Sequence, residues 1–193
     1  MVADDTMQLP QDAGRVLLPL ARAAIAAELG RQMPAPRDTA WMRETGASFI
    51  TLMREARLRG CIGTLRAHRA IAEDVRRNAI AAAFRDPRFT PLTLAEFESV
   101  SVEVSVLSPM APLVFASERE ALDQLRPGVD GIVFEYGRHA STFLPQVWKD
   151  FADPAEFMAH LKYKAGLPPD FWDGEVKLSR YAVTKWREAD NGD

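Results

Sequence analysis

The stretch Leu58-Arg59-Gly60-Cys61-Ile62-Gly63-Thr64-Leu65 carries the clearest indication of the fold. It contains the only cysteine of the chain, with a glycine directly before it and another two residues after it. Residues 46–53, which precede it, are bulky and β-branched as in a strand, and residues 67–84, which follow it, have the apolar spacing of a helix. This order predicts a hairpin whose second strand carries Cys61 near its end, just before a turn and the start of a helix.

Two neighbouring segments extend this prediction. In residues 67–84 the apolar side chains form one stripe, and the charged side chains, Asp74 among them, are predicted to form the solvated face of the helix. Residues 100–107 alternate between valine and other residues, which predicts a strand with one buried face and one mostly polar face. Glu103 belongs to the polar face of this predicted strand.

The order of these elements indicates the fold class. Predicted strands and helices alternate irregularly and successive strands are joined by short connections, whereas parallel βαβ units would need regular alternation. The sequence therefore predicts an α+β fold with a mainly antiparallel sheet and flanking helices. We expect one domain over residues 11–187 with flexible tails at residues 1–10 and 188–193, since both ends are polar.

Composition narrows the class of protein. The chain is 47% hydrophobic and 26% charged with a net charge of −3, which is typical of a globular protein and lacks the basic excess of most nucleic-acid binders. A lone cysteine cannot form an intramolecular disulfide, which suits a reducing compartment. No run approaches the roughly 18 apolar residues that span a bilayer. These features predict a cytoplasmic protein without a membrane segment.

Cys61 is the candidate catalytic residue. Arg57, Arg59 and Arg66 lie close to it in sequence, and cations together with a helix start favour a reactive thiolate. An unreactive cysteine buried on a strand explains the same residue, because free cysteine is among the most buried residue types. No histidine stands at a spacing that would identify a general base.

The residues around Cys61 are the candidate ligand-binding residues: Arg59, Gly60, Gly63, Asp86 and Arg88. The glycines indicate either a bulge or tight turn, or the close approach of an anionic ligand to bare backbone. Asp86 fits a turn before a proline and Arg88 an ion-pair partner, although the fold can also bring both, with Glu103, to Cys61. A local patch of arginines leaves RNA open as a ligand: Arg54, Arg57, Arg59, Arg66, Arg69 and Arg76.

No cofactor or metal site is predicted from the sequence. The glycine spacing lacks both the lysine of a phosphate-binding loop and the third glycine of a dinucleotide fingerprint. The three histidines, at positions 68, 139 and 160, do not have the spacing of metal ligands.

Several segments together resemble a known family. Residues 58–63 are similar to the signature of the AMMECR domain family, whose prokaryotic members are called AmmeMemoRadiSam system protein A. Further blocks resemble this family in the same order, namely residues 47–52, 83–89, 103–109, 128–131, 143–148 and 161–167. The resemblance covers nearly the whole chain.

The resemblance implies an α+β fold made of a larger and a smaller subdomain, and it implies no established reaction. Family members occur with Memo-like and radical-SAM proteins, which are therefore the implied partners. Two hypotheses follow. The first is an accessory binding module that works with such partners in a modification pathway. The second is an enzyme that uses Cys61 in a glycine-lined cleft on an anionic small molecule or RNA.

Overall fold

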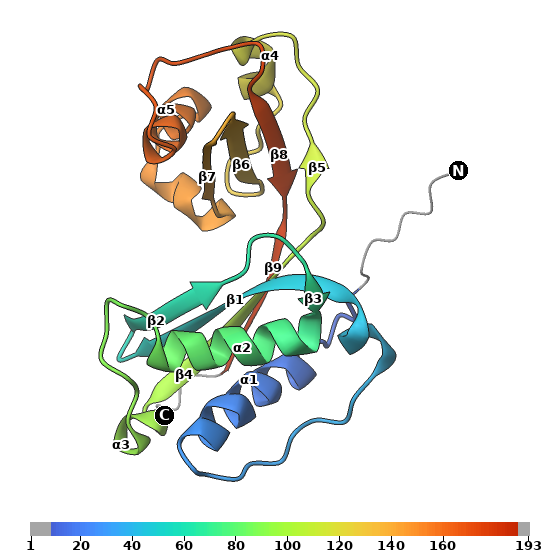
Figure 1. Cartoon of the computed structure of the whole chain (residues 1–193), viewed down its shortest axis with the longest axis vertical. Coiled ribbons are helices and arrows are strands. Elements are labelled where there is room, and N and C mark those ends of the chain that lie inside the picture. Colours follow the sequence, from blue (N-terminus) through green and yellow to red (C-terminus); the bar gives the residue numbers. More distant parts are fainter. Residues whose placement is uncertain (1–8, 189–193) are drawn as a thin grey trace. The chain divides into compact units, whose positions relative to one another are not determined.

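The structure, a computed structural model, describes residues 9–188, and the chain divides into two compact units. Unit 1 comprises Met1–Ser108 together with Thr184–Asp193, and unit 2 comprises Pro109–Val183. Each unit has its own antiparallel sheet (Figure 1). The predicted α+β class with mainly antiparallel strands is confirmed, and the chain has a larger and a smaller part as the resemblance implied. One domain over residues 11–187 stays a prediction.

Unit 1 is a sheet covered by helices. The strand order is β2-β1-β4-β9, and β3 pairs with β1. The strands are β1 (Thr45–Arg54), β2 (Arg57–Gly63), β3 (Arg69–Ala70), β4 (Val100–Leu107) and β9 (Val183–Arg187). The helices are α1 (Gly14–Glu28), the 3-10 helix η1 (Ala40–Arg43), α2 (Ile71–Phe84) and α3 (Leu94–Phe97).

One core joins these helices to one face of the sheet. Each described helix of unit 1 contributes a buried side chain, as Leu17 does from α1 and Val75 from α2. They pack against every second residue of the central strands, because side chains of a strand alternate between its faces. The strand residues of this core are Ile50, Leu52, Val100, Val102, Val104 and Val106.

The predicted hairpin is confirmed. β1 and β2 pair antiparallel from Phe49 opposite Gly63 to Arg54 opposite Arg57, and the two turn residues between them have positive φ. The register shifts once, because Gly60 pairs with Leu52 whereas Leu58 pairs with Met53. Arg59 is therefore the extra residue of a β-bulge, which re-aims its side chain.

Two expectations about the helix after the motif are wrong. α2 begins at Ile71, because the preceding residues Arg69 and Ala70 pair with β1 as strand β3. Cys61 therefore lies within β2 and does not immediately precede a helix. Asp74 was predicted to face solvent but is fully buried (0% exposed). Its carboxylate tolerates burial because it accepts hydrogen bonds, for example from the Ser48 hydroxyl of β1.

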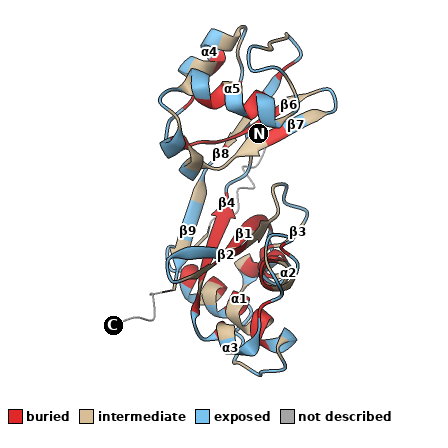
Figure 2. Cartoon of the chain, turned by 90° about the vertical axis from the view of Figure 1, so that its left-hand side faces the viewer, coloured by how far each residue is buried: buried red, intermediate tan, exposed pale blue. Residues whose placement is uncertain are grey.

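The predicted strand at residues 100–107 is present as β4, but both of its faces are buried (Figure 2). β4 lies between β1 and β9, so each edge of the strand is covered by a neighbour. On the face predicted to be mostly polar, Glu103 is only 5% exposed. Its carboxylate tolerates burial because Lys185 Nζ lies at 2.8 Å and Arg187 Nη2 at 3.1 Å.

Unit 2 is a four-stranded sheet in the order β5-β8-β6-β7 with its own core. At the centre of that core the Trp148 ring stacks on Phe157 at 3.7 Å between centroids, and Trp148 Nε1 donates to the Asp130 carbonyl at 2.6 Å. The strands are β5 (Ala111–Pro112), β6 (Gly131–Tyr136), β7 (His139–Phe143) and β8 (Lys177–Tyr181). The helices are α4 (Glu118–Asp123), the 3-10 helix η2 (Pro145–Asp150) and α5 (Pro154–Lys164).

Residues 1–8 and 189–193, which belong to the predicted flexible tails, lie outside the described residues. Glu188, assigned to the C-terminal tail by the sequence, accepts hydrogen bonds from the Arg22 guanidinium and from the Val102 backbone N–H. Across residues 9–188, every helix is too short or too polar to cross a membrane.

Candidate functional site

Cys61 lies in a row of three residues that crosses the sheet of unit 1. It is directly opposite Thr51 on β1, which in turn is directly opposite Glu103 on β4. Residues that face each other across antiparallel strands project from the same face of the sheet. Cys61 Sγ is 3.3 Å from Thr51 Oγ1. We call Cys61, Thr51 and Glu103 the Cys61 row.

The Cys61 row lies on the face of the sheet that the described helices of unit 1 leave uncovered. Ile50 and Leu52, which flank Thr51, point into the helix-covered core, so Thr51 points the other way. The helix-free face, as we call it, carries the Cys61 row together with Phe49, Met53 and Ser101. Cys61 and Thr51 are half-buried.

Asp86 and Arg88 hold the backbone of Cys61. The Cys61 N–H donates to Asp86 Oδ2 at 2.9 Å, and Arg88 Nη2 donates to the Cys61 carbonyl at 3.2 Å. Arg88 also donates to both carboxylate oxygens of Asp86, at 3.0 and 2.7 Å. These bonds occupy polar groups of the Cys61 backbone that point away from β1, which protects this edge strand from pairing with another chain.

The ion pair of Asp86 and Arg88 shifts both pKa values. The Arg88 guanidinium, helped by the N–H groups of Cys61 and Arg88 and opposed by burial, holds the pKa of Asp86 well below its usual range. Asp86 in turn raises the pKa of Arg88, against the opposing effect of burial. Asp86 is thus a permanently ionised acceptor at neutral pH and is unsuited to proton transfer. The structure brings Asp86 and Arg88 to Cys61, whereas their role in ligand binding stays a prediction.

The β-bulge turns the Arg59 side chain toward α3, where it forms an ion pair with Glu96. Its Nε and Nη2 donate to the two carboxylate oxygens of Glu96 at 3.1 and 3.2 Å, and Nη2 also donates to the Thr90 carbonyl at 3.0 Å. Arg59, together with the backbone N–H of Thr93, lowers the pKa of Glu96 to about 2. The Thr93–Glu96 capping box that starts α3 is thereby tied to the motif.

Packing accounts for both glycines of the motif. A Cβ at Gly60 would lie 2.2 Å from the Ala82 carbonyl oxygen of α2, and a Cβ at Gly63 would lie 2.2 Å from the Phe49 ring. Neither position admits a side chain unless a neighbour moves. The close approach of α2 and of Phe49 therefore explains these residues without a ligand, and a ligand at Gly60 or Gly63 remains a prediction.

Sequence reasoning missed a buried polar cluster on the other face of the hairpin. Asp74 Oδ2 accepts from the Ser48 N–H at 2.8 Å and from Ser48 Oγ at 2.7 Å, and Asp74 Oδ1 accepts from Thr64 Oγ1 at 2.8 Å. Asn78 Nδ2 donates to Asp74 Oδ2 at 2.9 Å and to the Ser48 carbonyl at 2.9 Å. One signal was available in the sequence, because Asp74 and Asn78 are four residues apart and adjoin the apolar stripe of α2.

The residues around Cys61 offer limited chemistry. Among the described residues, the hydrogen bond of the Cys61 sulfur goes to a threonine hydroxyl, which is no strong base. His68 is exposed, and its ring nitrogens contact the Arg66 carbonyl at 2.9 Å and Arg69 Nη2 at 2.6 Å. Within residues 9–188, no group of three or more histidine, cysteine or acidic side chains is arranged to hold a metal ion.

Comparison with known proteins places this geometry in a family context. The sequence matches the AMMECR1 family model over residues 18–186. A protein of Methanothermobacter thermautotrophicus is 37% identical over 185 residues, which cover 93% of this chain and 96% of that protein. A protein of Methanocaldococcus jannaschii is 42% identical over 135 residues, or 69% of this chain and 67% of that protein. The crystal structure of an uncharacterised protein from Pyrococcus horikoshii is similar with a TM-score of 0.80 and 34% identity, covering 93% of each chain.

Proposed function

We propose that this chain, which belongs to the AMMECR1 family, is an accessory binding module that engages a protein partner through the helix-free face of unit 1. The observation that carries the proposal is the different use of the motif residues. Arg59 is paired with Glu96 through Nε and Nη2, although its buried Nη1 has no partner among the described residues, and the approach of α2 fills the space at Gly60. The Cys61 side chain, in contrast, projects from the helix-free face with a single hydrogen bond among the described residues.

The composition of the helix-free face supports a protein partner. Phe49 and Met53 supply apolar, half-buried surface, and Thr51 and Ser101 supply hydroxyl groups beside it. Protein interfaces combine apolar area with a modest number of hydrogen-bonding groups and have few charges at their centre. The charged side chains shown at this face, Glu103, Lys185 and Arg187, are paired with one another where β4 adjoins β9.

The partners that we propose are Memo-like and radical-SAM proteins, which the family resemblance implies. The chain would position one of them in a shared modification pathway. Support for this assignment comes from the family membership and from the absence of a metal cluster or acid–base pair at Cys61 among the described residues.

Co-purification from the native host tests the proposal. The tagged wild-type chain should recover a Memo-like or radical-SAM protein, identified by mass spectrometry under mild lysis. Thr51→Lys places a charge in the middle of the helix-free face and should reduce that recovery at least about tenfold. Arg77→Gln is the matched control, since Arg77 pairs with Glu73 on the solvent side of α2. Recovery of the wild-type chain alone, or equal recovery with Thr51→Lys, would contradict the proposal.

Thiol chemistry on an anionic small molecule or RNA is a second candidate function. Its support is that the half-buried Cys61 lies next to a hydroxyl and that the Arg88 guanidinium donates to the carbonyl of the same residue. The rate of alkylation by iodoacetamide, measured against pH, checks this candidate. A rate profile equal to that of free cysteine, or a Cys61→Ser variant that keeps full function in cells, rules it out.

A further inference from the structure

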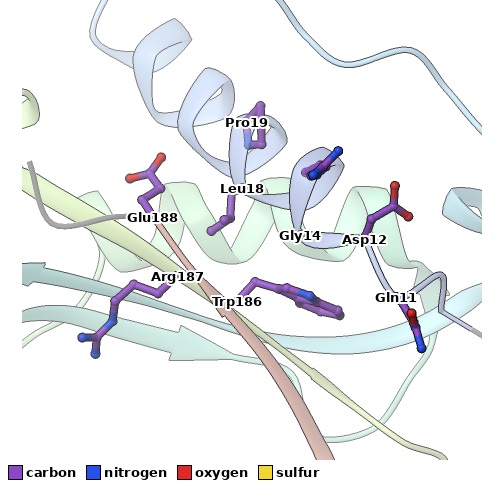
Figure 3. A pocket seen from close by; sticks show the side chains of 9 residues that line it. Gln11, Asp12, Gly14, Leu18, Pro19, Trp186, Arg187 and Glu188 are labelled. Carbon is purple, nitrogen blue, oxygen red and sulfur yellow. The ribbon is translucent and has the colours of Figure 1, made fainter.

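A pocket in unit 1 lies between the start of α1 and the end of β9 (Figure 3). Its volume is about 640 Å³. Sites for small organic ligands usually measure roughly 300–1,000 Å³ and combine apolar walls with a few polar groups. The apolar walls here are Trp186, Leu18 and Pro19, and the rim is polar. None of the residues of the Cys61 row lines this pocket.

The main apolar surface of the pocket is held in place before any ligand arrives. A Cβ at Gly14 would lie 2.4 Å from both Cδ1 and Cγ of Trp186, so the indole rests directly on the helix backbone. Any residue other than glycine would displace the ring. Trp186 thus offers a fixed planar surface against which another planar ring can stack.

Three polar side chains at the rim of the pocket form no bonds within the described part of the chain. Within residues 9–188, the side chains of Gln11, Asp12 and Arg15 make no hydrogen bond or ion pair. The charged residues on the β9 side are engaged, because Arg187 donates to Glu103 and Glu188 accepts from Arg22. The free groups therefore gather on the α1 side of the pocket and include both donors and acceptors.

Pro19, which lines the pocket, interrupts the hydrogen-bond ladder of α1. Pro19 has no N–H, so the carbonyl of Arg15, four residues before it, lacks its usual helical donor. The amides at the start of α1 are less available, because the N–H groups of Arg15 and Val16 donate to the carbonyls of Asp12 and Ala13 at 2.9 and 3.0 Å. The helix start is therefore not arranged to bind a phosphate or carboxylate.

These features discriminate between ligand classes. An aliphatic ligand would make no use of the rim groups, which are exposed to water, and a simple cation would meet Arg15 and Arg187. A simple anion would meet Asp12 and Glu188. We propose that the pocket binds a planar heteroaromatic ring of the nucleobase class, stacked on Trp186 with its donors and acceptors bonded by Gln11, Asp12 and Arg15. A nucleobase has a flat face for stacking and an edge with both donors and acceptors.

Calorimetric titration of the full chain with adenosine, guanosine, cytidine and uridine tests the proposal. At least one nucleoside should bind with one-to-one stoichiometry, and Trp186→Leu should weaken that binding roughly 5- to 100-fold. Gly14→Ala should weaken it as well, because the added Cβ displaces the indole while leaving it in the chain. Gly174→Ala is the matched control, since its Cβ would meet nothing within 4 Å.

Two further outcomes bear on the proposal. Asp12→Ala changes an exposed rim residue without touching the core, so a loss of preference among the four nucleosides in this variant supports recognition of the ring edge. No binding of any nucleoside at about 10 mM overturns the proposal. Binding that is unaffected by both Gly14→Ala and Asp12→Ala also overturns it. Partner recovery through the helix-free face is measured separately, so either proposal can fail without the other.

Discussion

Ser48 and Thr51 are three residues apart on strand β1, yet their surroundings differ completely. Ser48 is fully buried on the helix side, where its N–H and hydroxyl both donate to Asp74 and its carbonyl accepts from Asn78. Thr51 is half-buried on the helix-free face, where its hydroxyl contacts Cys61. The two sides of one hairpin thus carry a closed polar cluster and a sparsely bonded one.

The difference separates structural from functional polar residues. Buried donors and acceptors cost free energy when they are left unpaired. In the cluster around Ser48, the Ser48 backbone and hydroxyl are all bonded to Asp74 and Asn78, and Arg69 adds an ion pair with Asp74. Cys61 and Thr51 are half-buried and make few internal bonds, so both can bond to a partner without disrupting the core, whereas Glu103 of the same row is buried and paired with Lys185 and Arg187. We expect mutations in the first cluster to affect stability and mutations in the second to affect function.

The largest effect should come from Asp74→Ala. This change leaves the buried N–H and hydroxyl of Ser48 without their acceptor, removes one acceptor each from Thr64 and Asn78, and opens a cavity. We expect a loss of about 3–5 kcal/mol in the free energy of unfolding, measured by urea denaturation. Asp74→Asn keeps the volume and should lose less. A loss below about 1 kcal/mol for Asp74→Ala would mean that the closed cluster does not hold α2 to the hairpin.

Gly60→Ala should come second. The new Cβ would lie 2.2 Å from the Ala82 carbonyl, so α2 must shift away from β2. We expect a loss of about 2–3 kcal/mol in the free energy of unfolding, whereas Gly174→Ala, whose Cβ meets nothing, should change it by less than about 0.5 kcal/mol. Equal effects of the two substitutions would refute the close approach of α2 as the reason for Gly60.

Glu96→Gln should have a smaller, pH-dependent effect. Arg59 lowers the pKa of Glu96 from 4.5 to about 2 in the folded chain, so the ionised form is the one that stabilises the fold. The stabilisation is full above pH 4.5 and is lost as the pH falls toward 2.

We expect Glu96→Gln to lose about 1–2 kcal/mol at pH 7, since solvent reaches part of this ion pair and screens it. Urea unfolding of both proteins between pH 7 and pH 2 measures the difference, which should shrink toward acid. A difference that is constant over this range would show that the charge of Glu96 does not contribute.

Cys61→Ser should have the smallest effect on stability. The substitution is nearly isosteric, the site is half-buried, and the Thr51 hydroxyl can bond a serine as it bonds the thiol. We expect a change within about 1 kcal/mol by urea denaturation. A loss comparable to that of Asp74→Ala would place Cys61 with the structural residues and remove the contrast between the two faces.

Local patterns in the sequence predicted the elements that depend on neighbouring residues. The hairpin around the motif, the strand at residues 100–107 and the α+β class follow from alternation and from turn positions, and all are confirmed. The start of α2 was misplaced because Arg69 and Ala70 pair with β1, a contact that no local pattern reveals.

The candidate site was predicted only in part. Proximity in the sequence pointed to Cys61 and its glycines, and the structure places Asp86 and Arg88 beside them. The partners of Arg59 and Glu103 could not be anticipated, because Glu96, Lys185 and Arg187 approach them from distant segments. Asp74 was predicted to lie on the solvent-exposed face of the helix because it is charged, although it is adjacent to the apolar stripe.

The sequence by itself determined the signature stretch, the hairpin that contains it, the fold class and the family resemblance, since these depend on residue type and spacing within short segments. Only the tertiary structure decided which polar residues are buried and paired. In the folded chain Ser48 is buried and bonded to Asp74, and α2 packs directly against Gly60. Cys61 lies half-buried on the helix-free face. The physical reason is that burial and ion pairing depend on which distant segments come together.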